Sequence, residues 1–312
     1  MDDLAHQSSM IKAEARHLGF DGCGISRAGY LAEDASRLSG WLAEKQHGEM
    51  SWMENNQEKR TDPTRLVEGA QSVISVILNY FPSEKQEADA PVIAKYAYGK
   101  DYHDVIRAML RKLLAYIRQE IAPANGRAFT DSAPVLDRAW AARAGLGWIG
   151  KNTNLISPEI GSFVFIGSLI LDIPLQYDNP ISDLCGDCNR CVRACPTSAI
   201  TAPRRIDARK CISYLTIENR GEIAETYRDK FRNRVFGCDI CQDVCPWNRK
   251  TVPHKTQEFE PLPGLLEMKR EDWYKLDEQQ FNERFSQSAL ERAGYEGLIR
   301  NLGFIRPENW LS

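Results

Sequence analysis

The sequence has no long apolar run, no export signal and no large excess of charge. No stretch of the 312 residues approaches 18 uncharged apolar residues, so the sequence predicts no membrane-spanning helix. The N-terminus, Met1 to Leu4, lacks a basic n-region, a twin-arginine pair and an apolar h-region. The formal net charge of −3 by itself argues against a general nucleic-acid binder. We therefore expect a cytoplasmic protein that does not contact a membrane.

Three common cofactor motifs are also missing. Residues 145–151 almost fit the phosphate loop G-x-x-x-x-G-K-[ST], but Asn152 stands where the hydroxyl that binds Mg²⁺ should be. No G-x-G-x-x-G follows a predicted strand, so a Rossmann nicotinamide site is unsupported. Residues 101–106 resemble the D-x-H-x-x-G signature of proteins that offer cobalamin a histidine, but Ile106 replaces the glycine. His103 is therefore expected to be a capping or surface residue of a helix.

Cysteine, by contrast, is present in an informative pattern. Eight of the nine cysteines lie in two motifs and the segment between them. The motifs are Cys185-x-x-Cys188-x-x-Cys191-x-x-x-Cys195-Pro196 and Cys238-x-x-Cys241-x-x-x-Cys245-Pro246. The first is typical of bacterial ferredoxins, in which three cysteines bind one [4Fe–4S] cluster and the fourth binds the other cluster. The pattern predicts a pair of [4Fe–4S] clusters.

The second motif has only three cysteines, so a second cluster needs one more ligand. Cys211 lies between the motifs and is the only candidate in that region. We assign Cys185, Cys188, Cys191 and Cys245 to the first cluster, and Cys195, Cys211, Cys238 and Cys241 to the second. Paired C-x-x-C motifs also bind zinc, but zinc motifs seldom carry the third closely spaced cysteine and the Cys-Pro endings. A disulfide framework is less expected, because such frameworks belong to small secreted domains.

The rest of the sequence mixes strands and helices in an α+β pattern. Apolar runs and periodicity predict strands near 20–26, 73–78, 128–131 and 163–171, and helices near 4–18, 31–45, 102–121 and 135–144. Residues 50–63 have no clear period and are expected to form an ordered loop. We predict an α+β domain over 1–178, a ferredoxin-like domain over 179–255 and a mostly helical extension over 256–312. The ninth cysteine, Cys23, is expected to be a small core residue.

Basic residues are concentrated in the cysteine-rich part of the chain. Residues 203–250 contain eleven Lys and Arg against seven Asp and Glu, a local excess of 11 − 7 = 4. The simpler interpretation is a solvated face of a small domain. The alternative is a patch that contacts phosphate groups.

Several blocks outside the ferredoxin motif resemble the epoxyqueuosine reductase family. They occur in order over roughly residues 10–250, which makes the resemblance far more specific than a ferredoxin motif alone. The blocks are Met50-Ser-Trp-Met53, Glu58-Lys-Arg60-Thr-Asp-Pro63, Tyr98-Gly-Lys-Asp101-Tyr102-His103, Asp131-Ser132-Ala-Pro134, Gly145-Leu-Gly-Trp-Ile-Gly-Lys-Asn152, Cys211-Ile-Ser-Tyr-Leu-Thr-Ile217 and Cys238-Asp-Ile-Cys-Gln-Asp-Val-Cys-Pro-Trp247. The resemblance implies an oxidoreductase that reduces the epoxide of epoxyqueuosine to queuosine at the wobble position of a tRNA.

The resemblance also implies the fold, the cofactors and the partners. It implies that residues 1–178 form a reductive-dehalogenase-like domain that binds base-off cobalamin, followed by a bacterial ferredoxin-like domain with two [4Fe–4S] clusters. A cob(I)alamin centre fed by the clusters would carry the electrons, and an external low-potential donor would reload the clusters. The implied substrate is a tRNA with a queuosine-type wobble position, and the basic excess becomes a candidate tRNA-contacting face. The family blocks place these residues around the cobalamin: Arg60, Tyr98, Asp131, Ser132, Lys151, Asn152, Ser213 and Gln242.

The resemblance assigns the catalytic acid to Asp131. To protonate an oxygen near pH 7, this carboxyl group needs a raised pKa, which burial against an apolar corrin face could provide. The alternative is structural, because Asp131-Ser132-Ala133-Pro134 before a predicted helix is also a good N-cap sequence.

The chain ends at Ser312, too short for the C-terminal helical-repeat module found in many members of the family. A short form of this kind leaves two other functions open. A cobalamin-dependent, reductive-dehalogenase-like enzyme for a small molecule would use a tyrosine as its proton donor in place of Asp131. A non-catalytic ferredoxin-type electron carrier would bind no cobalamin, but about 180 residues before the clusters are hard to justify for a carrier.

Overall fold

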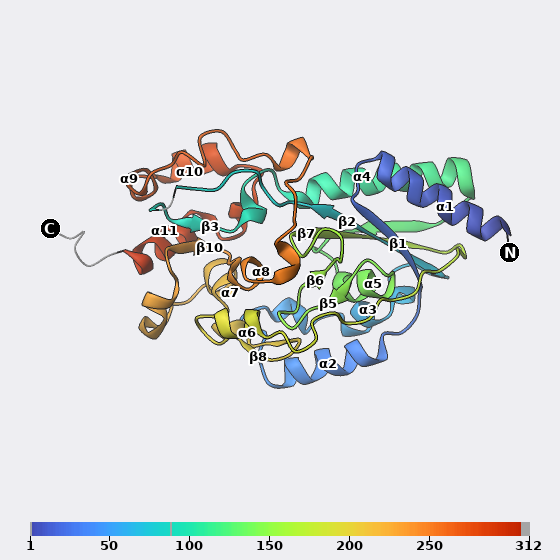
Figure 1. The fold of residues 1–312 in the computed structure, drawn as a ribbon, viewed down its shortest axis with the longest axis horizontal. Coiled ribbons are helices and arrows are strands. Elements are labelled where there is room, and N and C mark those ends of the chain that lie inside the picture. Colours follow the sequence, from blue (N-terminus) through green and yellow to red (C-terminus); the bar gives the residue numbers. More distant parts are fainter. Residues whose placement is uncertain (1, 88, 307–312) are drawn as a thin grey trace.

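The computed structural model describes residues 2–87 and 89–306 (Figure 1). Its helices are α1 (Asp2–His17), α2 (Ala32–Ala43), α3 (Gln57–Thr61), α4 (Tyr102–Tyr116), α5 (Asp137–Arg143), α6 (Arg190–Ala194), α7 (Ile212–Ile217), α8 (Ile240–Asp243), α9 (Arg270–Tyr274), α10 (Glu278–Phe285) and α11 (Gly294–Ile305). Its strands are β1 (Gly22–Arg27), β2 (Ser72–Asn79), β3 (Val92–Ile93), β4 (Gly126–Phe129), β5 (Trp148–Ile149), β6 (Leu155–Ile156), β7 (Val164–Leu171), β8 (Ile200–Ala202), β9 (Arg205–Ile206) and β10 (Arg234–Phe236). The mixture confirms the predicted α+β class.

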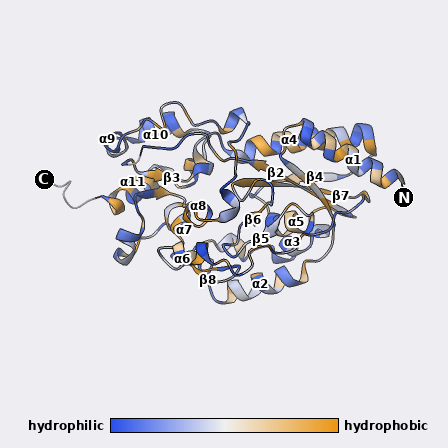
Figure 2. Cartoon of the chain, in the orientation of Figure 1, coloured by the Kyte–Doolittle hydropathy of each residue, from blue (hydrophilic) through white to orange (hydrophobic). Residues whose placement is uncertain are grey.

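A four-stranded sheet of order β1-β2-β7-β4 forms the centre of the first region, and its neighbouring strands are all antiparallel. Strand β2 lies inside the sheet, and all eight of its residues are buried. Ile74, Val76 and Leu78 of β2 pack with the core under α1 and α4, whereas Val73 and Ile77 pack on the side of α5. A strand covered on both faces must be apolar at nearly every position, which explains the continuous apolar run of the sequence. Figure 2 shows the hydrophobic colouring concentrated along these central strands.

Helix α4 lies unusually close to the sheet, and this contact positions the site described below. A Cβ on Gly167 of β7 would lie 2.6 Å from Cγ2 of Ile106 and 3.0 Å from Cδ1 of Leu110, so only glycine permits the approach. At the N-terminus of α4, the ring of Tyr102 stacks on Phe165 of β7 with centroids 4.1 Å apart. The sheet therefore fixes the first turn of α4.

The second region is built from short elements joined to segments far away in the sequence. Strand β3 pairs in parallel with β10, although about 140 residues separate them. One core cluster unites Ile93 and Phe236 of these strands with Trp273, Phe285 and Leu302 of the C-terminal helices (Figure 1). This packing crosses both predicted domain boundaries. The boundaries themselves remain a prediction.

Most predicted elements occur within a few residues of their expected positions, and two need correction. The segment 50–63 is not a plain loop, because it contains the 3₁₀ turn η1 (Ser51–Met53) and helix α3. These one-turn helices are too short to show an apolar period. The predicted helix 102–121 becomes a π-helical turn after Tyr116. Over the described ranges, no helix combines the length and apolar character that crossing a bilayer requires.

Candidate redox and acid–base site

The seven motif cysteines and Cys211 are all free thiols, and they divide into two groups. In the first group, burial raises the pKa of Cys191 and Cys245, and neighbouring thiols raise it further. Cys185 and Cys245 raise the pKa of Cys191, and Cys185 and Cys188 raise the pKa of Cys245. The four members, Cys185, Cys188, Cys191 and Cys245, are the four assigned to the first cluster.

The second group contains the two largest pKa shifts among these thiols. Burial raises the pKa of Cys238 to about 12, with Cys211 as a further cause, and Cys195 is the thiol neighbour of Cys211. Burial, followed by Cys238 and Cys211 and then Cys191 of the adjacent first group, raises the pKa of Cys241 well above its usual value. Cys195, Cys211, Cys238 and Cys241 are thus near one another, as the assignment to the second cluster requires. Among the described residues, no three such side chains converge closely enough to hold a single metal ion.

Two of the cysteine sulfur atoms accept hydrogen bonds from the protein. The Trp148 indole N–H donates to Sγ of Cys185 at 3.3 Å, and the backbone N–H of Ala199 donates to Sγ of Cys195 at 3.3 Å. Such donors stabilise thiolates and raise the reduction potential of a cluster that the thiolates hold. The donor chemistry therefore fits iron–sulfur clusters, and the ligand assignment stays a prediction that this geometry supports.

Asp131 lies two residues after the end of β4, close to the first turn of α4. Its Oδ2 accepts a short hydrogen bond from the Tyr102 hydroxyl group and lies 3.6 Å from Nε2 of His103. Nδ1 of His103 is in turn 2.6 Å from Oδ1 of Asp101, the N-cap of α4. The Asp131 side chain is 68% exposed, so a substrate can reach it. Sequence reasoning missed His103 and Tyr102 as functional residues, although the block Tyr98 to His103 contained both.

Asp131 does not cap a helix. Helix α5 begins at Asp137 with Leu136 as its N-cap, so the alternative structural role is wrong. Instead, Asp131 adopts a left-handed backbone conformation with φ of 51°, which costs energy for a residue other than glycine. The hydrogen bond from Tyr102 helps to hold it there. Strain of this kind is concentrated at functional sites, so it makes Asp131 a candidate functional residue.

The protonation pattern differs from the one expected. Desolvation by the surrounding protein by itself would raise the pKa of Asp131, although its side chain is largely exposed, but the donors of His103 and Tyr102 outweigh this effect and hold the pKa below its usual range. Burial alone would lower the pKa of His103, but the Asp101 and Asp131 carboxylates raise it to about 9. In the protein by itself, two donors that face the carboxylate hold the pKa of Asp131 low, and a raised pKa against the corrin face stays a prediction. Near pH 7 the proton resides on His103, and Asp131 is ionised.

A second carboxyl group lies behind Asp131. Burial raises the pKa of Asp137 to about 7, although the Ser168 hydroxyl donates to Oδ1 of Asp137 at 2.6 Å. The backbone of Asp131 is also a hydrogen-bonding partner of this carboxyl group. Asp137 therefore connects the strained Asp131 segment to β7. No motif of the sequence identified it.

An aromatic bridge connects the Asp131 site with the second cysteine group. The Tyr96 ring lies 6.2 Å from the Tyr102 ring and 6.0 Å from the Phe236 ring. Phe236 precedes Cys238 by two residues. The second group is thus the one that adjoins the acid–base site through packed side chains.

Several of the residues expected around cobalamin are already bonded within the protein. Arg60 donates to the carbonyl groups of Asn55 and Trp52, Lys151 to that of Gly186, and Gln242 to that of Ser162. The Ser132 hydroxyl donates to the Thr130 carbonyl. The backbone of Ser213 interacts with the Cys211 thiol, and Tyr98 lies near Cys238 and Asp239 in a small hollow. Their role at cobalamin stays a prediction.

Two buried polar groups do fit an additional polar ligand. Oγ1 of Thr130, beside Asp131, has no hydrogen-bond partner within the described residues. Nδ2 of Asn152 likewise lacks a partner of normal geometry within the described residues. The Asn152 side chain interacts with the Cys241 thiol and lowers its pKa, although burial raises that pKa by more. Unpaired buried donors are costly, so a bound group or cluster thiolate there would be stabilising.

Known proteins match nearly the whole length of this chain, both in sequence and in structure. The family described as 4Fe-4S double cluster binding domain matches residues 184–248, and the family described as Epoxyqueuosine reductase QueG, DUF1730 matches residues 60–132. An epoxyqueuosine reductase of Cellulophaga algicola is 51% identical over 98% of this chain and 100% of its own length. One of Escherichia coli is 40% identical over 96% of this chain and 80% of its own length.

Solved structures agree with these relatives. A crystal structure of epoxyqueuosine reductase with a tRNA-Tyr epoxyqueuosine-modified tRNA stem loop has a TM-score of 0.86 at 32% identity, covering 96% of this chain and 80% of that chain. A catabolic reductive dehalogenase has a TM-score of 0.52 at 21% identity, covering 80% of this chain and 33% of that chain, a likeness of fold alone. The fold and the cysteine region thus define an iron–sulfur oxidoreductase of reductive-dehalogenase-like fold. More specifically, the chain belongs to the epoxyqueuosine reductase family.

Proposed function

We propose that this chain reduces the epoxide of epoxyqueuosine at the wobble position of a tRNA, giving queuosine. The observation that carries the proposal is the exposed Asp131 carboxylate, held between Tyr102 and a His103 that is protonated near neutral pH. Removal of an epoxide oxygen as water needs two electrons and two protons. The cysteine region supplies the electron side of this requirement, and the Asp131 site supplies the proton side.

The protein's own residues assemble a proton relay. His103 holds a proton at Nε2, 3.6 Å from Oδ2 of Asp131, so Asp131 can accept it and present it to an oxygen in the site. Asp101 contacts the other ring nitrogen, Nδ1, and its carboxylate stabilises the charged form of the imidazole ring. Tyr102 orients the Asp131 carboxylate. An external acid is therefore not required for the first proton.

The residues also fit the cofactors that the resemblance implies. Cobalamin, when bound, would supply strongly reducing nucleophilic chemistry beside Asp131, with Thr130 and Ser132 as adjacent polar groups. The two cysteine groups would hold the [4Fe–4S] clusters, with the second group toward Asp131. A low-potential donor, a tRNA substrate and a cytoplasmic, reducing compartment complete the proposal.

The test is anaerobic reconstitution of the full chain with iron, sulfide and cobalamin, followed by a strong reductant and tRNA from cells that lack this protein. We expect cobalamin in the visible spectrum and conversion of epoxyqueuosine to queuosine, measured by nucleoside analysis. Bound cobalamin without conversion would overturn the substrate and favour a dehalogenase-like reaction. Absence of cobalamin binding would overturn the enzymatic proposal and leave an electron carrier.

A further inference from the structure

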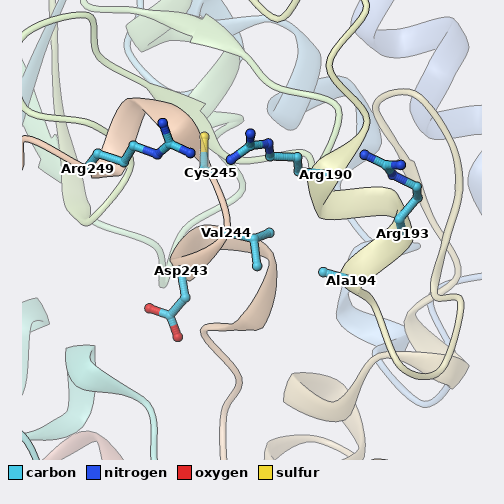
Figure 3. Close-up of a pocket in the computed structure, with 7 residues that line it drawn as sticks. All are labelled: Arg190, Arg193, Ala194, Asp243, Val244, Cys245 and Arg249. Carbon is cyan, nitrogen blue, oxygen red and sulfur yellow. The ribbon is translucent and has the colours of Figure 1, made fainter.

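A basic hollow opens beside the first cysteine group. It has a volume of about 480 Å³ and is lined by Arg190, Arg193, Ala194, Asp243, Val244, Cys245 and Arg249. Figure 3 shows the Arg190 and Arg249 side chains extending toward Cys245 from opposite sides, while the Asp243 carboxylate points away. We call the arginines Arg190, Arg193 and Arg249 the arginine cluster.

The arginine cluster is not neutralised by the protein. All three residues are exposed, and within residues 2–87 and 89–306 none has an ion-pair or side-chain hydrogen-bond partner. The one acidic residue of the hollow, Asp243, is 2.7 Å from Nζ of Lys95 instead. Like charges that converge without partners repel one another, and this cost is repaid only when an anionic group binds.

Four neighbouring arginines have acidic partners, unlike the arginine cluster. Arg204 pairs with Asp183, Arg205 with Glu44, Arg209 with Asp207 and Arg228 with Glu225. These ion pairs compensate part of the basic excess of residues 203–250. The arginine cluster is an uncompensated charge beside the first cysteine group.

We infer that the arginine cluster is the docking surface for a small acidic electron-carrier protein, which delivers electrons one at a time to the cluster held by Cys185, Cys188, Cys191 and Cys245. This inference deepens the proposed function, and it rests on that proposal only for the presence of the clusters. In each transfer the carrier is oxidised by one electron and the cluster is reduced by one electron, with no bond made or broken.

Position and composition favour a carrier protein over tRNA. The second cysteine group adjoins the Asp131 site through Tyr96, whereas Cys245 of the first group lines the hollow, so a carrier bound at the hollow would lie next to the first group. Exposed apolar side chains also accompany this part of the chain: Leu184, next to Cys185, is 47% exposed, and Val252 is 58% exposed. Charged and apolar groups together are typical of transient protein–protein contacts.

The test uses the full chain with reconstituted clusters, without tRNA or cobalamin. The probe is an acidic flavodoxin, because its flavin spectrum can be followed separately. Stopped-flow absorbance measures cluster reduction by the reduced probe, and calorimetry measures the affinity of the oxidised probe. For the double variant Arg193→Gln/Arg249→Gln we expect about a tenfold loss in both quantities at low ionic strength and a weaker dependence on salt.

Matched controls separate docking charge from damage. Arg111→Gln/Lys112→Gln removes the same charge from an exposed part of α4 and should behave like the unaltered protein. Reduction by the small cation of reduced methyl viologen and the iron content should be unchanged in all variants. Arg193→Lys/Arg249→Lys should restore most of the lost rate, because it restores the charge.

Three results would overturn the inference. The first is an equal flavodoxin affinity and an equal rate of cluster reduction in Arg193→Gln/Arg249→Gln and in the control Arg111→Gln/Lys112→Gln. The second is an Arg→Lys variant as poor as the Arg→Gln variant, which would show that the loss does not come from charge. The third is unchanged flavodoxin reduction with weakened binding of a tRNA anticodon stem loop, which would assign the surface to nucleic acid. None of these depends on epoxide reduction, so the proposed function can stand or fall separately.

Discussion

The sheet region and the cysteine region obtain their order in different ways. Strands β2 and β7 have eight residues each, and apolar helices cover both faces of β2. Around the cysteines, α6 has five residues, α8 has four and β8 has three. Elements this short cannot bury enough apolar surface to be stable by themselves. The comparison teaches that one region is ordered by its own core, whereas the other depends on packing against distant segments and, we expect, on what its cysteines bind.

The thiols of the cysteine region make this dependence stronger. Burial raises the pKa of Cys238 to about 12 and that of Cys241 well above its usual value, so without metal these thiols are protonated at pH 7. A metal ligand must be a thiolate, so cluster binding must release these protons. Folding of the cysteine region and cluster binding are therefore coupled.

The largest expected effect comes from breaking the second cysteine group. Cys241→Ser should lower the iron content from about eight to about four atoms per chain and abolish epoxide reduction, because electrons no longer reach the Asp131 site. Amide hydrogen exchange should accelerate over 200–250 and stay slow in β2 and β7. The control is Cys23→Ser. Cys23 lies in β1, outside both cysteine groups, so this variant should keep its full iron content. If amide exchange in Cys241→Ser stayed as slow over 200–250 as in β2 and β7, the two regions would not differ in their dependence on the cluster.

A large effect confined to the acid–base site is expected for Asp131→Asn. The substitution leaves the size of the side chain unchanged but removes the proton-transferring carboxylate, so kcat should fall by about 10²–10⁴-fold. Iron and cobalamin contents should not change. Asp104→Asn, an exposed carboxylate in the first turn of α4, serves as the matched control and should be fully active. Full activity of Asp131→Asn would show that another group is the acid.

A smaller effect with a distinctive pH dependence is expected for His103→Gln. The pKa of His103 is raised to about 9, so the unaltered enzyme should lose activity as the pH rises through about 9 and the imidazole loses its proton. In His103→Gln, kcat should be roughly tenfold lower at pH 7 and should lack this alkaline decline. Rates measured from pH 6 to 10 check this. An unchanged alkaline limb in the variant would assign the decline to a different group.

The smallest effect concerns the stability of the sheet region. The pKa of Asp137 is raised to about 7, so the folded protein keeps this proton between about pH 4 and 7 while the unfolded chain has lost it. Its contribution to stability is therefore present at low pH and is lost as the pH rises toward 7. Asp137→Asn should remove this decline, by at most about 4 kcal/mol across the window. Urea unfolding of the two proteins at pH 5 and 7.5 measures the difference, and parallel pH dependence would contradict the assignment.

Much of the sheet region could be predicted because its signals are local. The apolar run of 73–78 and the stripe of 102–121 correspond to β2 and α4, since a strand or helix must match its burial in its own sequence. Helix α3 was missed because five residues carry no period. The pairing of β3 with β10 could not be predicted either, because strands of two and three residues give no register signal.

The sequence by itself determined the chemistry of the cysteine region, because the ligand spacing of a ferredoxin motif is local and specific. It also determined the family, through short blocks in a fixed order. Only the tertiary structure decided how Asp131 is protonated, since its partners Tyr102 and His103 lie about thirty residues away and reach it by the packing of α4 on β7. The same is true of the arginine cluster, which joins α6 to the end of the second motif. Distances between charges set pKa values and docking surfaces, and those distances exist only in the folded chain.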